Sequence, residues 1–215
     1  MSADRESIKP LRIAVLLSGG GTTLRNVLDW IDAGRLDVEV GLVVSSKEGV
    51  AGLQYADRAG CPGVVIRRED YPSTDAFSRE IFDRCNEIGV DLVVMAGFLK
   101  RIAVPEDYVG RVTNIHPSLI PAFCGKGYYG KRVHRAVVEY GAKVSGCTVH
   151  YADNEYDHGP VILQRVVPVL DNDTADVLAA RVFEAECEAY PTALQLIAEG
   201  RVEIIGRRVR IRDEA

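Results

Sequence analysis

Apolar and polar residues form blocks along this chain that predict strands and helices in turn. Residues 11–17 and 38–45 are almost continuously apolar, a pattern typical of strands that are buried on both faces of a sheet. After the first of these strands, Leu24, Val27 and Ile31 recur at helical spacing. Strands that alternate with helices form parallel βαβ units. We therefore expect an α/β fold, with a Rossmann-like, mostly parallel sheet and helices on both of its faces.

The same pattern continues to the end of the chain. It predicts further helices over residues 51–59, 74–87 (with Thr74 as N-cap), 133–140 and 173 or 174 to about 199. It predicts further strands over residues 64–66, 91–95, 144–151 and 161–169, an extended segment ending at His116, and a terminal hairpin over 202–211. Residues 1–10 are polar and charged, and we expect a flexible N-terminus there. Because no repeat, low-complexity segment or linker interrupts the pattern, we expect residues 1–215 to form one domain.

A glycine-rich turn, residues 18–23, joins the first strand to the first helix. A strand, a glycine turn and a helix in this order direct free backbone N–H groups toward an anion, and the helix dipole adds to the attraction. The third glycine of the dinucleotide-binding motif would fall at Leu24, so a monophosphate fits the turn better than a dinucleotide does. The alternative is a tight turn that uses glycine only for its backbone angles.

Asn114 and His116 are candidate catalytic residues. Side chains two residues apart in an extended segment point to the same side, so both can act on one point. The carboxamide can donate a hydrogen bond, and the imidazole can donate or move a proton. Pro117 and Pro121 stiffen the segment that follows. The alternative is a turn in which Asn114 caps backbone groups and His116 is a hydrogen-bonded core residue.

Residues 125–131 match the first seven positions of a P-loop, G-x-x-x-x-G-K. Arg132 stands where a Ser or Thr must hold magnesium, and Pro121 separates the segment from any preceding strand. We therefore expect a mobile, basic, glycine-rich loop beside the site, and not a nucleotide-binding loop.

Two further features place carboxylates near the predicted site. Residues 153–160 form a loop rich in Asp and Glu between two predicted strands, although Asp, Asn, Gly and Pro are also common in an ordinary solvated turn. Glu186 falls on the apolar stripe that Leu178, Val182 and Ala189 form on the long helix. A carboxylate on such a stripe must find partners, unless it lies at the solvated edge of the stripe.

Composition and charge narrow the classes of function. The net charge of −5 argues against a general nucleic-acid binder. No apolar run approaches the ~20 residues of a membrane span, and the N-terminus lacks the apolar core of a signal peptide. No CxxC pair occurs, so neither a zinc site nor a redox dithiol is indicated. We expect a cytoplasmic protein without nucleic-acid or membrane partners, and with five reduced, mostly buried thiols: Cys61, Cys85, Cys124, Cys147 and Cys187.

Four segments together resemble the phosphoribosylglycinamide formyltransferase family. They are SGGGTTL at 18–24, MAGFL at 95–99, NIHPSLIP at 114–121 and DHGP at 157–160. The resemblance extends from about residue 11 to residue 202. The HPSLIP segment alone also resembles folate-dependent formyltransferases that act on methionyl-tRNA or on sugars. The glycine turn and the position of Glu186 before Tyr190 favour the glycinamide ribonucleotide enzymes.

The resemblance implies the formyltransferase fold and a reaction of de novo purine biosynthesis. In that reaction a formyl group passes from 10-formyltetrahydrofolate, the cosubstrate, to the amine of glycinamide ribonucleotide, without a metal. The expected partners are these small molecules, and the expected state is a monomer or a homodimer. Asn114 and His116 would stabilise the oxyanion that develops. Asp157 would bind His116 and shuttle a proton, directly or through a water.

The resemblance also assigns the binding residues. Gly20, Gly21, Thr22 and Thr23 would hold the substrate phosphate, and Glu186 the ribose hydroxyls. The folate-binding residues would be Leu99, Ile102, Arg111, Asp153, Asn154, Glu155 and Tyr156. Three alternatives stay open: a formyltetrahydrofolate hydrolase, another folate-dependent formyltransferase, and a non-catalytic module that binds a phosphate-bearing ligand.

Overall fold

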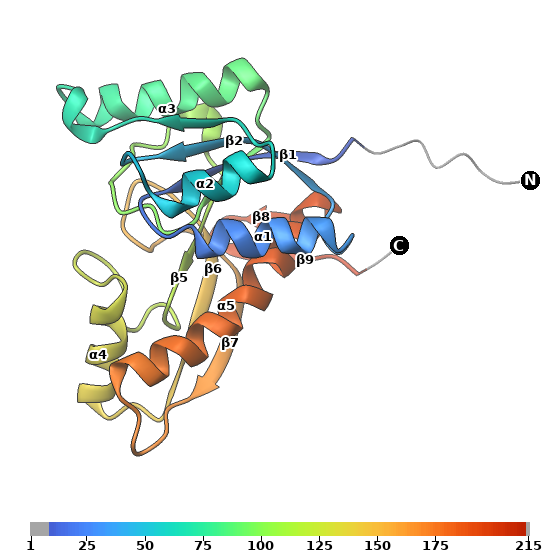
Figure 1. The fold of residues 1–215 in the computed structure, drawn as a ribbon. Helices are drawn as coiled ribbons and strands as arrows, with labels where there is room; N and C mark the ends of the chain where they lie inside the picture. The colour runs from blue at the N-terminus through green and yellow to red at the C-terminus, as the bar shows by residue number, and fades with distance from the viewer. Residues whose placement is uncertain (1–8, 214–215) are drawn as a thin grey trace, which may run out of the picture.

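A computed structural model describes residues 9–213, which contain a seven-stranded sheet covered by helices (Figure 1). The strand order is β3-β2-β1-β4-β5-β6-β7; neighbouring strands are parallel from β3 to β5 and antiparallel from β5 to β7. The strands are β1 (Leu11–Leu17), β2 (Val38–Ser45), β3 (Gly63–Val65), β4 (Leu92–Met95), β5 (Val112–His116), β6 (Val144–Tyr151) and β7 (Val161–Pro168). The sheet is therefore mostly parallel, as the sequence predicts.

Five α-helices, two short 3-10 helices and a small hairpin complete the described chain. The α-helices are α1 (Thr22–Asp32), α2 (Ala51–Arg58), α3 (Thr74–Ile88), α4 (Lys131–Tyr140) and α5 (Ala175–Ala198). The 3-10 helices are Arg68–Asp70 and Glu106–Tyr108, and the predicted terminal hairpin is formed by β8 (Val202–Ile205) and β9 (Arg208–Ile211). Of the N-terminus that we expect to be flexible, residues 1–8 lie outside the described part.

Strand β1 explains why the sheet has helices on both faces. Its side chains alternate, and none of those from Ile13 to Leu17 is exposed. Ile13, Val15 and Leu17 pack with buried residues of α1, α2 and α5, whereas Ala14 and Leu16 pack with those of α3. In Figure 1, α3 accordingly lies on the opposite side of the sheet from α1, α2 and α5.

Helix boundaries differ slightly from those that the sequence predicts. The N-cap of α3 is Ser73, not Thr74, because the backbone of Ser73 is extended and its Oγ accepts a hydrogen bond from the backbone N–H of Ala76 at 3.1 Å. Strand β3 begins and ends one residue earlier than the apolar run at 64–66. Thr174 is the N-cap of α5, in agreement with the prediction.

The turns that follow β1 and β4 are joined to each other. The backbone N–H of Ser18 donates to the Gly97 carbonyl at 3.2 Å, and the Ser18 Oγ accepts from the backbone N–H of Leu99 at 2.9 Å. These bonds fix the loops at the carboxyl ends of two neighbouring parallel strands, which is where α/β sheets bind their ligands.

Gly21 is required by packing as well as by its backbone conformation. It has a φ of 67° at the N-cap of α1, and a Cβ at this position would lie 2.3 Å from the Cα of Gly52 in α2. A structural need for glycine at residue 21 is thus present whether or not the turn binds phosphate.

We expect Gly21→Ala to lower the free energy of unfolding by on the order of 2–5 kcal/mol, because strain at positive φ adds to overlap with backbone atoms. Denaturant titration followed by circular dichroism measures the loss. The control is Gly19→Ala in the same turn, where an added Cβ has no neighbour within 4 Å. Equal stability of the two variants would contradict the packing argument.

Two further observations concern residues 9–213. No helix there is long and apolar enough to cross a membrane. The five cysteines of this part of the chain are all unpaired. Cys85 and Cys147 are buried, while Cys61, Cys124 and Cys187 are half-buried, so fewer thiols are fully buried than we expect from the sequence.

Candidate active site

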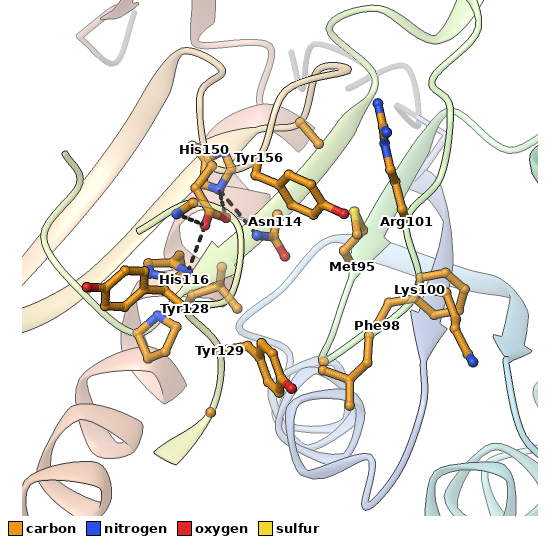
Figure 2. A pocket seen from close by; sticks show the side chains of 18 of the residues that line it. Met95, Phe98, Lys100, Arg101, Asn114, His116, Tyr128, Tyr129, His150 and Tyr156 are labelled. Carbon is orange, nitrogen blue, oxygen red and sulfur yellow. Dashed lines mark hydrogen bonds and ion pairs between the residues drawn. The ribbon is translucent and has the colours of Figure 1, made fainter. Parts of the chain in front are cut away.

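A cavity of about 670 Å³ opens at the carboxyl ends of β4 and β5 and contains most of the predicted site residues (Figure 2). Its walls come from these strands, from the loops after β4 and β6, from the loop before α4, and from α1, α4 and α5. Predicted residues that line it are Thr23, Leu99, Ile102, Asn114, His116, Asp153, Asn154, Glu155, Tyr156, Asp157 and Glu186. The structure therefore brings together residues that are far apart in the sequence.

Asn114 is held in place by His150 from the neighbouring strand. The two residues are directly opposite each other in the antiparallel pair β5–β6, and the Asn114 Nδ2 lies 3.2 Å from the His150 Nε2. The His150 Nδ1 lies 2.8 Å from the Tyr151 carbonyl, which can only accept, so Nδ1 carries a proton and Nε2 accepts one from Asn114. Burial lowers the pKa of His150, in agreement with a neutral ring. One amide hydrogen of Asn114 is engaged in this way, and the second is left for a ligand.

His116 lies between two acceptors. Its Nε2 is 3.0 Å from the Phe123 carbonyl, and its Nδ1 is 3.5 Å from the Asp157 Oδ2. The imidazole is almost completely buried. A ring placed between a carbonyl and a carboxylate makes two favourable contacts only when both of its nitrogens carry a proton.

Asp157 is the point at which three segments of the site meet. Its Oδ2 accepts a hydrogen bond from the Gly125 backbone N–H at 2.8 Å and also faces His116, while its Oδ1 lies 3.9 Å from the His150 Nε2. The backbone of Asp157 has a φ of 51°, which is uncommon for a residue other than glycine. The predicted pairing of Asp157 with His116 is therefore present, and a backbone N–H of the glycine-rich loop supports it.

Of the residues that are predicted to bind the ribonucleotide, some line the cavity and the others lie next to it. Thr23 lines the cavity in the first turn of α1, a helix that has no side-chain N-cap. Gly20, Gly21 and Thr22 lie in the adjoining turn and are not among the residues that line the cavity. Glu186 is half-buried at the cavity wall, and burial raises the pKa of its carboxyl group to about 7.

The loop after β6 contains most of the residues that are predicted to bind the folate. Hydrogen bonds hold this loop at both of its ends. The Asn154 side chain accepts a hydrogen bond from the Val104 backbone N–H at 2.9 Å and donates one to the Val104 carbonyl at 3.1 Å. The Asp153 Oδ2 lies 2.8 Å from the His158 Nδ1, and the His158 Nε2 lies 2.8 Å from an Arg207 guanidinium nitrogen on the terminal hairpin. These contacts give the loop a fixed place at the cavity.

Arg111 lies away from the cavity, contrary to its predicted role in folate binding. It precedes β5, whereas the cavity lies at the other end of that strand. Its guanidinium group donates to the backbone carbonyls of Val90, Asp91 and Asp107. Arg111 therefore fastens the amino-terminal end of β5 to the surrounding loops.

The predicted glycine-rich loop lies beside the site. Gly125, Gly127, Tyr128, Tyr129 and Gly130 line the cavity, and Figure 2 shows both tyrosines among its walls. The last residue of the P-loop-like match, Lys131, begins α4, and its Nζ lies 2.6 Å from the Asp176 Oδ1.

Sequence reasoning misses four groups of the site. His150 could have been noticed as the imidazole of a predicted strand whose other side chains are apolar or uncharged. The Phe123 carbonyl and the Gly125 N–H belong to the backbone and carry no signal of their own. His134 of α4 also lines the cavity, and its buried Nδ1 has no partner among residues 9–213. Burial, together with the neighbouring His116, lowers the pKa of His134.

Comparison with known proteins places this geometry in a family. The model of a family described as "Formyl transferase" matches residues 11–194. The chain belongs to the formyl transferase family. Within residues 9–213, this formyl transferase has no group of three or more His, Cys, Asp or Glu side chains placed to hold a metal ion.

Several relatives of this formyl transferase are known. The crystal structure of glycinamide ribonucleotide transformylase 1 from Symbiobacterium toebii is 42% identical, with a TM-score of 0.87 and 95% of each chain covered. The chloroplastic phosphoribosylglycinamide formyltransferase of Vigna unguiculata is 39% identical over 91% of this chain and 64% of its own length. The trifunctional purine biosynthetic protein adenosine-3 of Gallus gallus is 41% identical over 90% of this chain. The match spans only 19% of that chicken protein.

Proposed function

We propose that this formyl transferase transfers the formyl group of 10-formyltetrahydrofolate to the amine of glycinamide ribonucleotide. The products are N-formylglycinamide ribonucleotide and tetrahydrofolate, in de novo purine biosynthesis. The observation that carries the proposal is the group of Asn114, His116 and Asp157 in one cavity, between a wall with Glu186 and a wall made by the loop after β6. The names of the relatives support the choice of substrates.

The reaction needs donors for an oxyanion. When the amine attacks the formyl carbon, a tetrahedral intermediate forms and negative charge develops on the formyl oxygen. The second amide hydrogen of Asn114 would donate to this oxygen, and a protonated His116 ring, whose two nitrogens face the Phe123 carbonyl and Asp157, would stabilise the negative charge by its own positive charge. Because Asn114 is already held by His150, and His116 by the Phe123 carbonyl, little reorganisation is needed as the charge develops.

The reaction also moves one proton. The attacking amine becomes an ammonium group that must lose a proton, and the folate nitrogen must gain one as the carbon–nitrogen bond breaks. Asp157 is acidic, borders the cavity and faces His116. It can accept the proton directly or through a water and can stabilise the His116 imidazolium ion meanwhile.

The two ends of the cavity would bind the two substrates. Thr23, with the adjoining Gly20, Gly21 and Thr22, would hold the phosphate at the start of α1, and Glu186 would accept hydrogen bonds from the ribose hydroxyls. Leu99, Ile102 and residues 153–156 would surround the folate. Arg111 is left out of this assignment because its guanidinium group is bound elsewhere.

Glycinamide ribonucleotide should bind more weakly below pH 7, because of Glu186. Burial raises the pKa of this carboxyl group to about 7, above its ordinary value near 4.5, so the group gains a proton as the pH falls through that value. A protonated carboxyl group accepts hydrogen bonds from hydroxyls less well than a carboxylate does. Calorimetry between pH 8 and pH 6 should show the Kd of the ribonucleotide rising for the wild type.

The neutral variant Glu186→Gln should lose the part of the pH dependence that comes from Glu186. It should bind the ribonucleotide weakly over the whole range from pH 8 to pH 6. Glu184→Gln, on the exposed surface of the same helix, is the matched control. Identical pH dependence in the wild type and in Glu186→Gln would mean that Glu186 does not contact the ribonucleotide.

One assay separates the proposed reaction from its alternatives. Release of tetrahydrofolate from 10-formyltetrahydrofolate should require glycinamide ribonucleotide. Formate release that ignores the ribonucleotide would identify a hydrolase, in which water replaces the amine. Binding of the ribonucleotide without any transfer would identify a binding module.

The proposal also includes the cytoplasm as the place of the reaction and a monomer or homodimer as the working form. Light scattering coupled to size-exclusion chromatography distinguishes the two forms.

A further inference from the structure

The Phe123 carbonyl is an unusual partner for a catalytic imidazole, because the backbone must be turned to present it. Phe123 has a φ of 50°, in the left-handed region that residues other than glycine rarely occupy. Its carbonyl lies 3.0 Å from the His116 Nε2. A carbonyl oxygen only accepts hydrogen bonds, so this contact requires a proton on Nε2.

The Ser118 side chain also contacts the Phe123 carbonyl. Ser118 is 1% exposed, and its Oγ lies 2.6 Å from the Ala122 carbonyl and 3.3 Å from the Phe123 carbonyl. The backbone N–H of Ala122 also donates to the Leu119 carbonyl at 3.0 Å. The hydroxyl group therefore closes the turn of residues 118–123 mainly through the Ala122 carbonyl, and its longer contact with the Phe123 carbonyl restrains the next peptide group as well.

The backbone of Ser118 is itself fixed to the sheet. The Thr148 Oγ1 of β6 donates to the Ser118 carbonyl at 2.7 Å and accepts from the Ile120 N–H at 3.1 Å. The Gln164 Nε2 of β7 donates to the Thr148 Oγ1 at 2.9 Å and to the Ile120 carbonyl at 3.1 Å. One chain of hydrogen bonds thus leads from the antiparallel strands, through Ser118, to the carbonyl that faces His116.

We propose that Ser118 is a positioning residue for His116, which acts by holding the Phe123 carbonyl against the imidazole Nε2. Held in this way, the ring keeps its Nε2 proton even when it is neutral, and Nδ1 is the nitrogen that gains or loses a proton opposite Asp157. Without the hydroxyl group, the turn relaxes and the neutral ring divides between its two tautomers. The effect on rate rests on the proposed function, whereas the effect on the tautomer does not.

The test is the 15N nuclear magnetic resonance spectrum of His116, measured above the pKa of the ring, together with steady-state kinetics. In the wild type the Nε2 resonance should be that of a protonated nitrogen. Ser118→Ala should shift it toward the average of two tautomers. The same variant should lower kcat by ~10- to 100-fold with little change in either KM, because the imidazole ring is misplaced and not removed.

Ser145→Ala is the matched control. Ser145 is also a buried serine, in β6, and its Oγ has no partner among residues 9–213. This variant should leave both the spectrum and kcat unchanged. Ser118→Thr keeps the hydroxyl group and should retain the wild-type tautomer.

Several outcomes would overturn the proposal. A wild-type neutral ring without a proton on Nε2 would do so without any variant, so the test stands even if Ser118→Ala fails to fold. An unchanged tautomer and kcat in a folded Ser118→Ala would do so as well. If the wild type transferred no formyl group to glycinamide ribonucleotide, the proposed function would fail, and the spectra would still decide the role of Ser118.

Discussion

Asn114→Ala should lower kcat by roughly 10²–10³-fold, with little change in the Kd of either substrate, because it removes one preorganised oxyanion donor. The carboxamide is fixed by its bond to the His150 Nε2 before any ligand arrives. The remaining amide hydrogen meets a negative charge only in the transition state, so its loss affects the chemical step more than the binding of substrates.

Steady-state kinetics and equilibrium binding, measured on the same preparation, separate the two effects. Asn172→Ala is the control, since Asn172 lies exposed in the turn before α5, far along the chain from the cavity residues of β5. A variant whose defect appeared in KM while kcat stayed normal would show that Asn114 binds the substrate in its ground state and is not an oxyanion donor.

Asp157→Asn should reduce kcat by a comparable factor through a different route. The substitution removes the charge that faces His116 and the group that moves the proton. The carboxamide oxygen can still accept the hydrogen bond from the Gly125 N–H, so the variant tests the charge and the proton transfer and not this contact. Because Asp157 and His116 act as one unit, the double variant His116→Ala/Asp157→Asn should be little slower than the slower of the two single variants.

The kcat values of the wild type, the two single variants and the double variant form a complete cycle. Asp171→Asn provides the control. Among residues 9–213, the exposed carboxylate of Asp171 pairs only with Lys143. Losses that multiply fully in the double variant would mean that Asp157 works independently of His116, and the shared mechanism would have to be abandoned.

The fold could be predicted because strands that are buried on both faces of a sheet appear in the sequence as runs of mostly apolar residues. The bounds of β1, β2 and β6 agree with the predicted strands to the residue, since buried apolar side chains recur along each of them. The prediction of Thr74 as the N-cap of α3 is wrong because Ser73 and Thr74 are adjacent and both can cap a helix. The local conformation of the backbone decides between them.

The position of a site residue could be predicted only where the residues that act together lie in the same segment of the chain. Asn114 and His116 share a strand, so their common side follows from alternation. His150 faces them through the register of an antiparallel pair that no local pattern specifies. Arg111 is close to Asn114 in sequence, yet it precedes β5, and the five residues of that strand span ~15 Å, so the two ends of β5 serve different parts of the molecule.

The position of β6 beside β5 also has a consequence for protein synthesis. The parallel strands β1 to β4 are complete once the ribosome has passed Met95, and the glycine turn is already part of them. Asn114 and His116 emerge soon afterwards, but their partners, His150 and Asp157, follow about 40 residues later, which is several seconds at typical rates of translation. A nascent chain therefore carries the scaffold first and gains its reactive group of side chains only when the antiparallel strands pair.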